Sequence, residues 1–289
     1  MNIAETTKRT RTIQRRVPEL VCLPRPVYAR AEDMTQRSST HEHSHPWVQF
    51  SYASQGVLHM ETPGAVLIAP PQWGILVPPG QPHTVKNTAG TRMRSLYIAH
   101  DRLPRVIGHC VVVHVSELLG AMIRHFSGMP VQYDEQGAEG RLVQVMLDLI
   151  QNAPRADLAL PWPEHAGLQA LCTRFMKETG TRHAVSGHWS RALNISERTL
   201  GRLFVQETRL TLRTWLQRAR LLQSIPMLET GLSVTDTALA CGYDSTSAFI
   251  AAFHAFMGQT PGSLQRKRSH HPISTFDPHQ AAERKVSAT

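Results

Sequence analysis

The chain has 289 residues, 41% of them hydrophobic and 18% charged, which is typical of a globular protein and leaves room for two domains. It has no run of 18 apolar residues and no apolar segment after its basic start, so we expect neither a membrane span nor a secretory signal. Of the net charge of +9, +7 lies in residues 166–268, where 13 Lys and Arg stand against 6 Asp and Glu. This balance favours a polyanionic partner such as nucleic acid, although a solvated basic face is the alternative.

Four widely spaced cysteines favour reduced, buried thiols in the cytoplasm over a disulfide framework or a zinc knuckle. Residues 1–38 show no apolar period and are rich in Thr, Arg and Lys, so we expect a loose N-terminal arm.

Short apolar runs, separated by Gly and Pro, follow from His41 to Val113. They are rich in Val, Ile, Tyr and Trp, and this pattern predicts the strands of a β-barrel or sandwich. The runs cover residues 47–53, 56–61, 65–69, 73–77, 83–87, 94–99 and 110–115.

Two polar clusters interrupt the predicted barrel. His43 and His45 stand two residues apart, ahead of Gln49, and His83 follows the turn Pro78-Pro79-Gly80. The histidines suit a polar pocket for a small effector, a weak His₃ metal site, or plain structural positions at a barrel mouth. We expect an effector pocket that needs no metal or other cofactor. Its expected lining residues are His43, His45, Trp47, Gln49, Tyr52, Trp73 and His83, although the aromatic residues suit the core equally well.

These clusters resemble the two motifs of the cupin family. The second motif is matched at Pro78, Gly80, His83 and Asn87, whereas Gln49 stands where the first motif has a metal-binding Glu. The resemblance implies a jelly-roll barrel, and the neutral Gln49 implies at most a weak metal site.

Residues 116–126 and 140–151 have helical patterns. Apolar residues nearly encircle the second helix, so it packs either on its own barrel or in a dimer seam. The barrel domain is expected over residues 39–152, and the Pro-rich residues 153–164 are expected to be an interdomain linker.

Helical patterns fill residues 165–268, and one unit occurs twice, about 48 residues apart. In each copy a short helix is followed by a tight corner and then by a second helix with a serine N-cap, at Ser196 and at Ser245. A long helix over 210–230 joins the two copies. This pattern predicts an all-α domain with two helix-turn-helix units, followed by a flexible tail over 269–289.

The repeat is similar to the DNA-binding domain of the AraC/XylS family. The similarity is carried by RTL..LF and QET within 198–208 and by A...GY.S.S.F...F....G.TP from Ala238 to Pro261. It implies that the second helix of each unit, at 196–207 and 245–257, enters the DNA major groove. The implied DNA-binding positions are Ser196, Glu197, Arg198, Gly201, Arg202, Ser245, Thr246, Ser247 and Ala251.

The sequence therefore predicts an α+β protein with two domains, a cupin-like barrel and a double helix-turn-helix domain. The resemblance implies a bacterial, cytoplasmic, nucleoid-associated transcription regulator that is not an enzyme. Its expected partners are double-stranded promoter DNA, RNA polymerase, a small-molecule effector and a second copy of the chain. A cupin metalloenzyme fused to DNA-binding helices and a nonspecific DNA binder are the alternatives.

Overall fold

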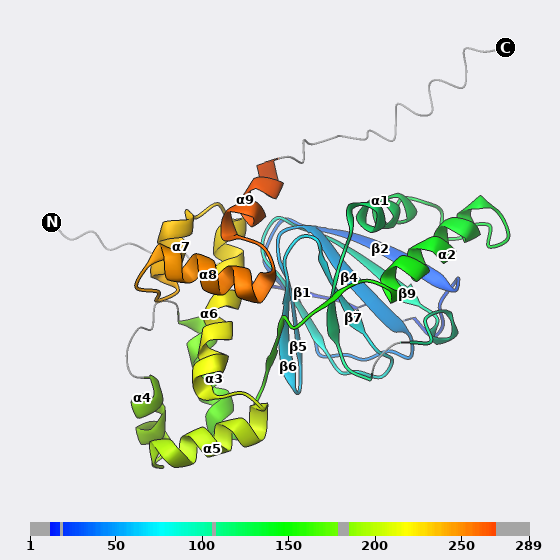
Figure 1. Cartoon of the computed structure of the whole chain (residues 1–289). Helices are drawn as coiled ribbons and strands as arrows, with labels where there is room; N and C mark the ends of the chain where they lie inside the picture. The colour runs from blue at the N-terminus through cyan, green and yellow to red at the C-terminus, as the bar shows by residue number, and fades with distance from the viewer. Residues whose placement is uncertain (1–11, 18–19, 106–107, 179–184, 270–289) are drawn as a thin grey trace, which may run out of the picture.

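Strands from residues 13–161 form two six-stranded sheets that make up a jelly-roll-like barrel (Figure 1). The computed structural model describes residues 12–17, 20–105, 108–178 and 185–269. In order across the first sheet, the strands are β1 (Ile13–Arg15), β3 (Ser38–Thr40), β8 (Thr84–Asn87), β5 (Leu58–Thr62), β6 (Ala65–Ala69) and β12 (Ala159–Pro161). Across the second they are β11 (Arg155–Ala156), β10 (Val111–His114), β7 (Trp73–Val77), β4 (Val48–Gln55), β9 (Thr91–Ile98) and β2 (Val27–Met34). The seven strands predicted from apolar runs are confirmed.

Alternation along the strands separates two cores. Residues such as Met60, Val77 and Met93 belong to a core that continues from the barrel into the helical domain. Val48 and Phe50 belong to a second core, which they share with α1 (Glu117–Phe126) and α2 (Ala138–Gln151). The helix α2 therefore packs on its own barrel, which was the simpler of the two expectations. A short 3₁₀ helix, η1 (His100–Arg102), follows β9.

The expectation of a loose arm over 1–38 is wrong for part of that segment. Residues 27–34 form β2, which pairs with β9 from Val27 opposite Ile98 to Met34 opposite Thr91. The strand VYARAEDM lacks an apolar run because one of its faces carries Arg30 and Glu32, which form an ion pair at 3.1 Å. A search for hydrophobic runs does not detect an edge strand whose charges are paired in this way. Residues 1–11 of the expected arm lie outside the described residues.

The expected linker over 153–164 is also part of the barrel. Arg155–Ala156 pairs with β10, and Ala159–Pro161 pairs with β6. Pro161 is tolerated because β12 lies at the edge of its sheet, where a missing N–H breaks no ladder. The segment crosses from one sheet to the other instead of acting as a free spacer.

The second half of the chain is helical, as predicted. The helices are α3 (Ala166–Lys177), α4 (Val185–Ala192), α5 (Glu197–Thr208), α6 (Leu212–Glu229), α7 (Val234–Ala240), α8 (Thr246–Met257) and α9 (Pro261–Ser269). Trp215 of α6 is fully buried and contacts the rings of Trp189, Phe204 and Phe175 at centroid distances of 5.8–6.3 Å. The central helix α6 thus organises the core of this domain. None of the described helices combines the length and the apolar character that a bilayer crossing requires. Residue 269 of the tail expected over 269–289 ends α9, and residues 270–289 lie outside the described residues.

Candidate nucleic-acid interface and ligand pocket

The corner between α4 and α5 is a left-handed turn at Asn194. Asn194 has φ 53°, its N–H donates to the Arg191 carbonyl at 3.1 Å, and the next N–H, of Ile195, donates to the Ser190 carbonyl at 3.0 Å. The Ser196 hydroxyl then caps α5 by accepting the Thr199 N–H at 3.1 Å. This short corner fixes the angle at which α5 leaves α4.

The corner between α7 and α8 repeats this geometry. Gly242 has φ 78°, its N–H donates to Leu239 at 3.0 Å, and the Tyr243 N–H donates to Ala238 at 3.0 Å. Ser245 caps α8 by accepting the Ala248 N–H at 3.2 Å. Both donor–acceptor spacings are the same as in the first corner, and the repeat offset is 48 residues (242 − 194). The internal repeat predicted from the sequence is therefore a structural repeat.

The exposed face of α5 carries two free guanidinium groups. Arg198 and Arg202 are both exposed, and neither forms an ion pair within the described part of the chain. A Cβ added at Gly201 would meet no atom within 4 Å, so the backbone is open to close approach there. Glu197 is exposed, and its carboxylate accepts the Ser186 hydroxyl of α4 at 2.7 Å, which ties the two helices together.

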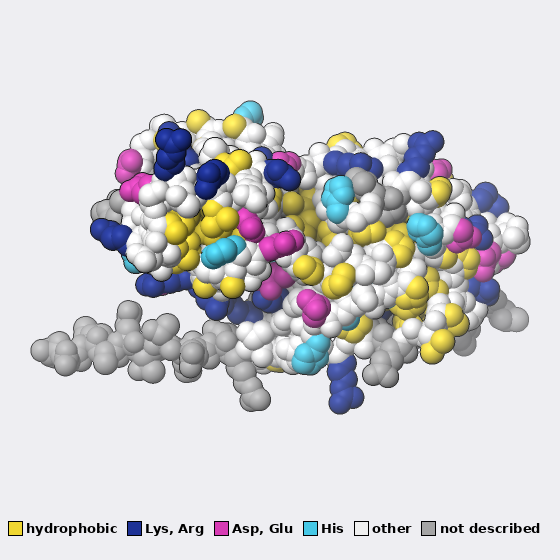
Figure 2. All heavy atoms as spheres, turned by 90° about the horizontal axis from the view of Figure 1, so that it is seen from below, with side chains coloured by type: hydrophobic (Ala, Val, Ile, Leu, Met, Phe, Trp, Pro, Cys, Tyr) yellow, Lys and Arg dark blue, Asp and Glu magenta, His cyan; other side chains and the backbone are white. Residues whose placement is uncertain are grey.

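The exposed face of α8 has a different chemistry. Ser247 and Ala251 are exposed, as is Ser245, whereas Thr246 is half-buried with its hydroxyl 3.5 Å from that of Thr235. Ile250, which the sequence reasoning missed, is 36% exposed on the same helix. Its place in a run of small apolar residues gave no signal of exposure. Figure 2 shows Lys and Arg side chains distributed over the surface of the helical domain.

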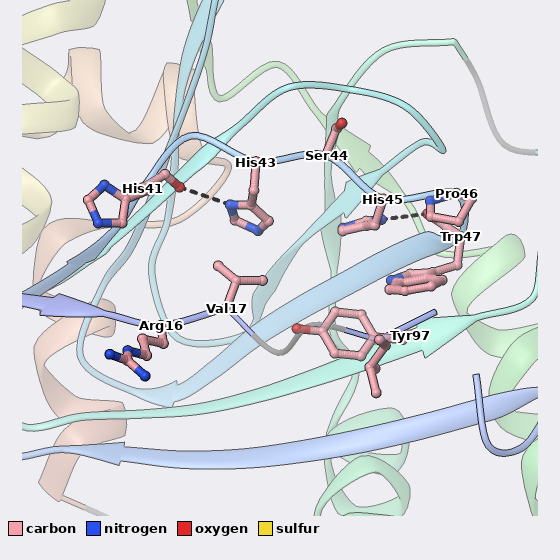
Figure 3. A pocket seen from close by; sticks show the side chains of 10 residues that line it. Arg16, Val17, His41, His43, Ser44, His45, Pro46, Trp47 and Tyr97 are labelled. Atoms are coloured by element: carbon pink, nitrogen blue, oxygen red, sulfur yellow. Dashed lines mark hydrogen bonds between the residues drawn. The ribbon is translucent and has the colours of Figure 1, made fainter. Parts of the chain in front are cut away.

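A pocket of about 720 Å³ opens at the mouth of the barrel (Figure 3). Its volume lies in the range of small-molecule sites. The lining residues are Arg16, Val17, Leu20, His41, His43, Ser44, His45, Pro46, Trp47 and Tyr97.

Aromatic rings and a buried polar chain form one wall of this pocket. The ring of His45 stacks on Trp47 at 5.3 Å, and Tyr97 lies 5.9 Å from both rings. Behind them, His45 Nε2 is 2.8 Å from the Gln49 amide oxygen, and the Gln49 amide nitrogen donates to Ser51 at 2.8 Å. The Trp47 indole N–H is buried with no hydrogen-bond partner, so a ligand acceptor could satisfy it.

The structure brings His43, His45, Trp47, Gln49 and His83 together and separates the other two predicted pocket residues. Tyr52 belongs to the core beneath α1 and α2, because it lies three positions after Gln49 and so faces the opposite side of β4. Trp73 is on β7 four residues before Val77, the partner of Gln49, which is about 13 Å along a strand. Its ring packs against His114 at 5.2 Å.

Two pocket residues were missed by the sequence reasoning. Tyr97 is directly opposite Gln49 in the ladder, so strand alternation within 94–99 could have identified it. Arg16 comes from the expected loose arm, and nothing in the local sequence points to it.

Comparison with known proteins agrees with both halves of this structure. Residues 25–160 match the AraC-like ligand-binding domain, and residues 189–267 match a helix-turn-helix domain family. The HTH-type transcriptional regulator NimR of Escherichia coli K12 is 30% identical over 220 residues, which span 76% of this chain and 80% of that protein. The chain belongs to the AraC family. It is a DNA-binding transcriptional regulator with a ligand-binding domain, as predicted, and its relatives are regulators and not enzymes.

Other matches are less similar in sequence. The transcriptional activator RhaR of Escherichia coli O139:H28 is 23% identical over 164 residues, 56% of this chain and 57% of that protein. A crystal structure of ToxT from Vibrio cholerae O395 aligns with a TM-score of 0.37 and 11% identity, over 85% of this chain and 99% of that one.

Proposed function

We propose that this AraC-family regulator reads promoter DNA with α5 and α8, each placed in a major groove by its own helix-turn-helix corner. The observation that carries the proposal is the pair of equivalent corners, which present α5 with Arg198 and Arg202 free and with an open backbone at Gly201. Two such helices on one domain can enter successive major grooves of DNA, which lie about 34 Å apart.

The two helix-turn-helix units differ in charge, so they make different kinds of contact with DNA. Residues 185–220 contain seven Arg and two Glu, whereas residues 221–265 contain no Lys or Arg and three acidic residues. The first unit therefore supplies the guanidinium contacts, including bidentate pairing of Arg198 or Arg202 with guanine. The second unit positions the domain through Ser245, Thr246 and Ser247, together with methyl contacts from Ala251.

Footprinting on an operator fragment and on random DNA tests this proposal with Arg202→Ala. Loss of guanine pairing is expected to weaken operator binding about 5- to 150-fold, equivalent to roughly 1–3 kcal/mol, with a smaller effect on random DNA. Arg174→Ala is a matched control, because Arg174 is exposed on α3 and pairs with Glu178 at 2.9 Å. Equal losses on both DNAs would show that Arg202 contacts only phosphate.

The pocket at the barrel mouth is the proposed effector site. His43, His45, Trp47 and Tyr97 line it, Gln49 supports His45 from below, and His83 packs on His43 at 4.2 Å. A polar molecule that accepts the free indole N–H of Trp47 fits this wall.

Reporter transcription with candidate effectors tests the pocket with Gln49→Ala and His83→Ala. If both variants keep the full response to every effector that activates the wild type, the pocket is not the effector site. RNA polymerase and a second copy of the chain remain proposed partners. Bacterial two-hybrid assays and sedimentation analysis, respectively, test these two contacts.

A further inference from the structure

The pocket at the barrel mouth is lined by basic side chains and by no acidic one. Arg16 and three histidines, His41, His43 and His45, are among its described lining residues, and no Asp or Glu is. Arg16 is exposed and forms no ion pair within the described part of the chain. The pocket therefore presents an unneutralised guanidinium group to a molecule that enters it.

Two further arginines share one carboxylate behind the pocket wall. Arg15 and Arg30 both pair with Glu32, at 3.0 and 3.1 Å, and the three side chains are at most 22% exposed. Arg30 also donates to the hydroxyl of Tyr97, which belongs to the wall, so this group lies directly behind it. Two guanidinium groups on one carboxylate leave one positive charge uncancelled. Because water screens partly buried charges only weakly, this charge adds to the positive potential of the pocket.

Two hydrogen-bond donors on the aromatic wall have no acceptor among the described residues. The indole N–H of Trp47 is buried and unpartnered, and Trp47 is only 7% exposed. The Tyr97 hydroxyl accepts from Arg30 at 3.2 Å, so its own hydrogen remains free to donate. In Figure 3 the indole nitrogen and this hydroxyl lie on the same side of their rings, toward Val17. A ligand atom that accepts hydrogen bonds would satisfy both donors.

The rest of the lining is apolar or already hydrogen-bonded. Val17, Leu20 and Pro46 contribute apolar surface. His45 offers mainly the face of its ring, because its two ring nitrogens already face protein oxygens at 2.9 and 2.8 Å. A ligand that fills this pocket therefore needs an apolar body as well as an end that accepts hydrogen bonds.

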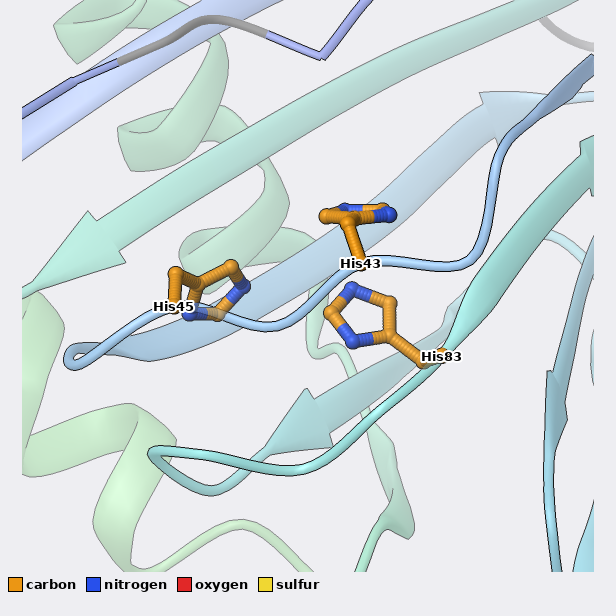
Figure 4. A group of neighbouring side chains, drawn as sticks. All are labelled: His43, His45 and His83. Atoms are coloured by element: carbon orange, nitrogen blue, oxygen red, sulfur yellow. The ribbon is translucent and has the colours of Figure 1, made fainter.

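Backbone hydrogen bonds hold the pocket in shape before a ligand arrives. His43 and His83 exchange two of them, at 3.0 and 2.9 Å. The His83 ring packs against the rings of His43 and His45 at centroid distances of 4.2 and 5.2 Å (Figure 4). The Gly80 N–H donates to the His45 carbonyl at 2.8 Å. Because these groups are already ordered, a ligand loses little free energy to ordering them.

We propose that this pocket selects an organic monocarboxylate with a small apolar body. A carboxylate only accepts hydrogen bonds, and it carries the charge that balances the surrounding arginines. Its two oxygens accept from Trp47 and Tyr97, and Arg16 is its counter-ion. An ammonium or amidinium group would meet only donors and like charge. The inference rests on the proposed effector site and names the class of molecule that the site takes.

Isothermal titration of the full-length protein with matched acids and amides tests this proposal. The probes are butanoate, hexanoate, cyclohexanecarboxylate and 2-naphthoate, each beside its primary amide, which has nearly the same shape and no charge. We expect a carboxylate to bind about tenfold or more tightly than its amide, because charge-assisted hydrogen bonds are the stronger ones. The proposal is overturned if none of these carboxylates binds, if the amides bind equally well, or if inorganic phosphate binds as tightly.

Two variants locate the bound carboxylate. Trp47→Phe keeps an aromatic ring and removes an N–H that has no partner in the free protein, so it should weaken carboxylate binding about tenfold. Arg16→Gln should weaken it several-fold and reduce the preference for acid over amide, which a folding defect cannot imitate. The matched control is Arg37→Gln, which alters an exposed arginine outside the pocket. Equal acid-over-amide preferences in Arg16→Gln and Arg37→Gln would contradict the proposal.

The test separates the class of ligand from the proposed effector site. If Gln49→Ala and His83→Ala abolish the reporter response while acids and amides bind alike, the effector site stands and the carboxylate class is wrong. If carboxylates bind selectively while both variants keep the full response, the pocket is a carboxylate site and the effector binds elsewhere.

Discussion

Asn194 and Gly242 occupy the same position in the two helix-turn-helix corners, with φ 53° and 78°. This left-handed conformation costs most residues roughly 1–2 kcal/mol, while Gly adopts it freely and Asn tolerates it. The side chain at this position therefore affects the stability of each corner, and with it how firmly the corner holds its reading helix.

Two substitutions at Asn194 measure how much this side chain contributes to the free energy of unfolding. Asn194→Ala should lower the free energy of unfolding by about 1 kcal/mol, because alanine gains no local hydrogen bond in the left-handed region. Asn194→Gly should change it by only a few tenths of a kcal/mol. Urea denaturation followed by tryptophan fluorescence gives both values, and equal losses would mean that the turn is not limiting.

The four cysteines differ sharply in environment. Cys22 is exposed, whereas burial raises the pKa of Cys110 and Cys172 to about 12 and that of Cys241 to about 11. The thiolate is the reactive form, so burial and a high pKa both suppress attack by these three thiols.

Thiol labelling with an aromatic disulfide at pH 8 should therefore show one fast thiol per native chain and four after denaturation. Cys22→Ser should remove the fast phase and leave the others. More than one fast thiol in the native chain would show that a buried cysteine is accessible.

At the scale of elements, β12 and α6 join the barrel to the helical domain. The buried Trp215 indole N–H donates to the Pro161 carbonyl at 2.7 Å, and Arg218 pairs with Asp157 at 2.7 Å. Glu207, on the reading helix α5, accepts the N–H groups of Glu164 and His165 at 2.7 and 3.0 Å. The segment that leaves the barrel is thus bonded both to the central helix and to a reading helix.

The two α6 contacts should differ in strength. Trp215→Phe leaves the Pro161 carbonyl without its donor and opens a small void in the core, so it should destabilise the protein by about 1–3 kcal/mol. Arg218→Ala should cost less than about 1 kcal/mol, because the Asp157 side chain is 70% exposed and water screens the pair. Thermal unfolding ranks the two variants, and a reversed order would contradict this assignment.

At the scale of the whole molecule, the arginines of residues 185–265 lie in the first helix-turn-helix unit and the first half of α6. All seven Arg within 185–265 lie before residue 221. Phosphate contacts release counterions, so the salt dependence of DNA binding reports how many of these side chains take part.

Binding measured across a salt series should locate these contacts. Arg213 is exposed at the start of α6, and Arg213→Ala should reduce the slope of log affinity against log salt by about 1. Ser247→Ala, in the second unit, should leave the slope unchanged, because no counterion is displaced by a neutral hydroxyl. A slope equally sensitive to both changes would contradict this placement of the phosphate contacts.

Much of this architecture could be read from local patterns. The apolar runs gave the strands from β4 to β10, and the serine caps with the Asn194 and Gly242 corners gave α5 and α8. These features depend on neighbouring residues, through alternation, capping and left-handed turns, so the sequence alone determined them. The resemblance to the cupin motifs also implied a shared site for these histidines.

Only the tertiary structure decided which segments pair and which way each side chain faces. It placed β2 beside β9, returned residues 155–161 to the barrel, turned Tyr52 away from the pocket and brought Arg16 into it. It also brought His83 beside His43, through an isolated antiparallel bridge between two separate segments. Such outcomes depend on contacts between segments distant in the chain, and these have no counterpart in the local order of residues.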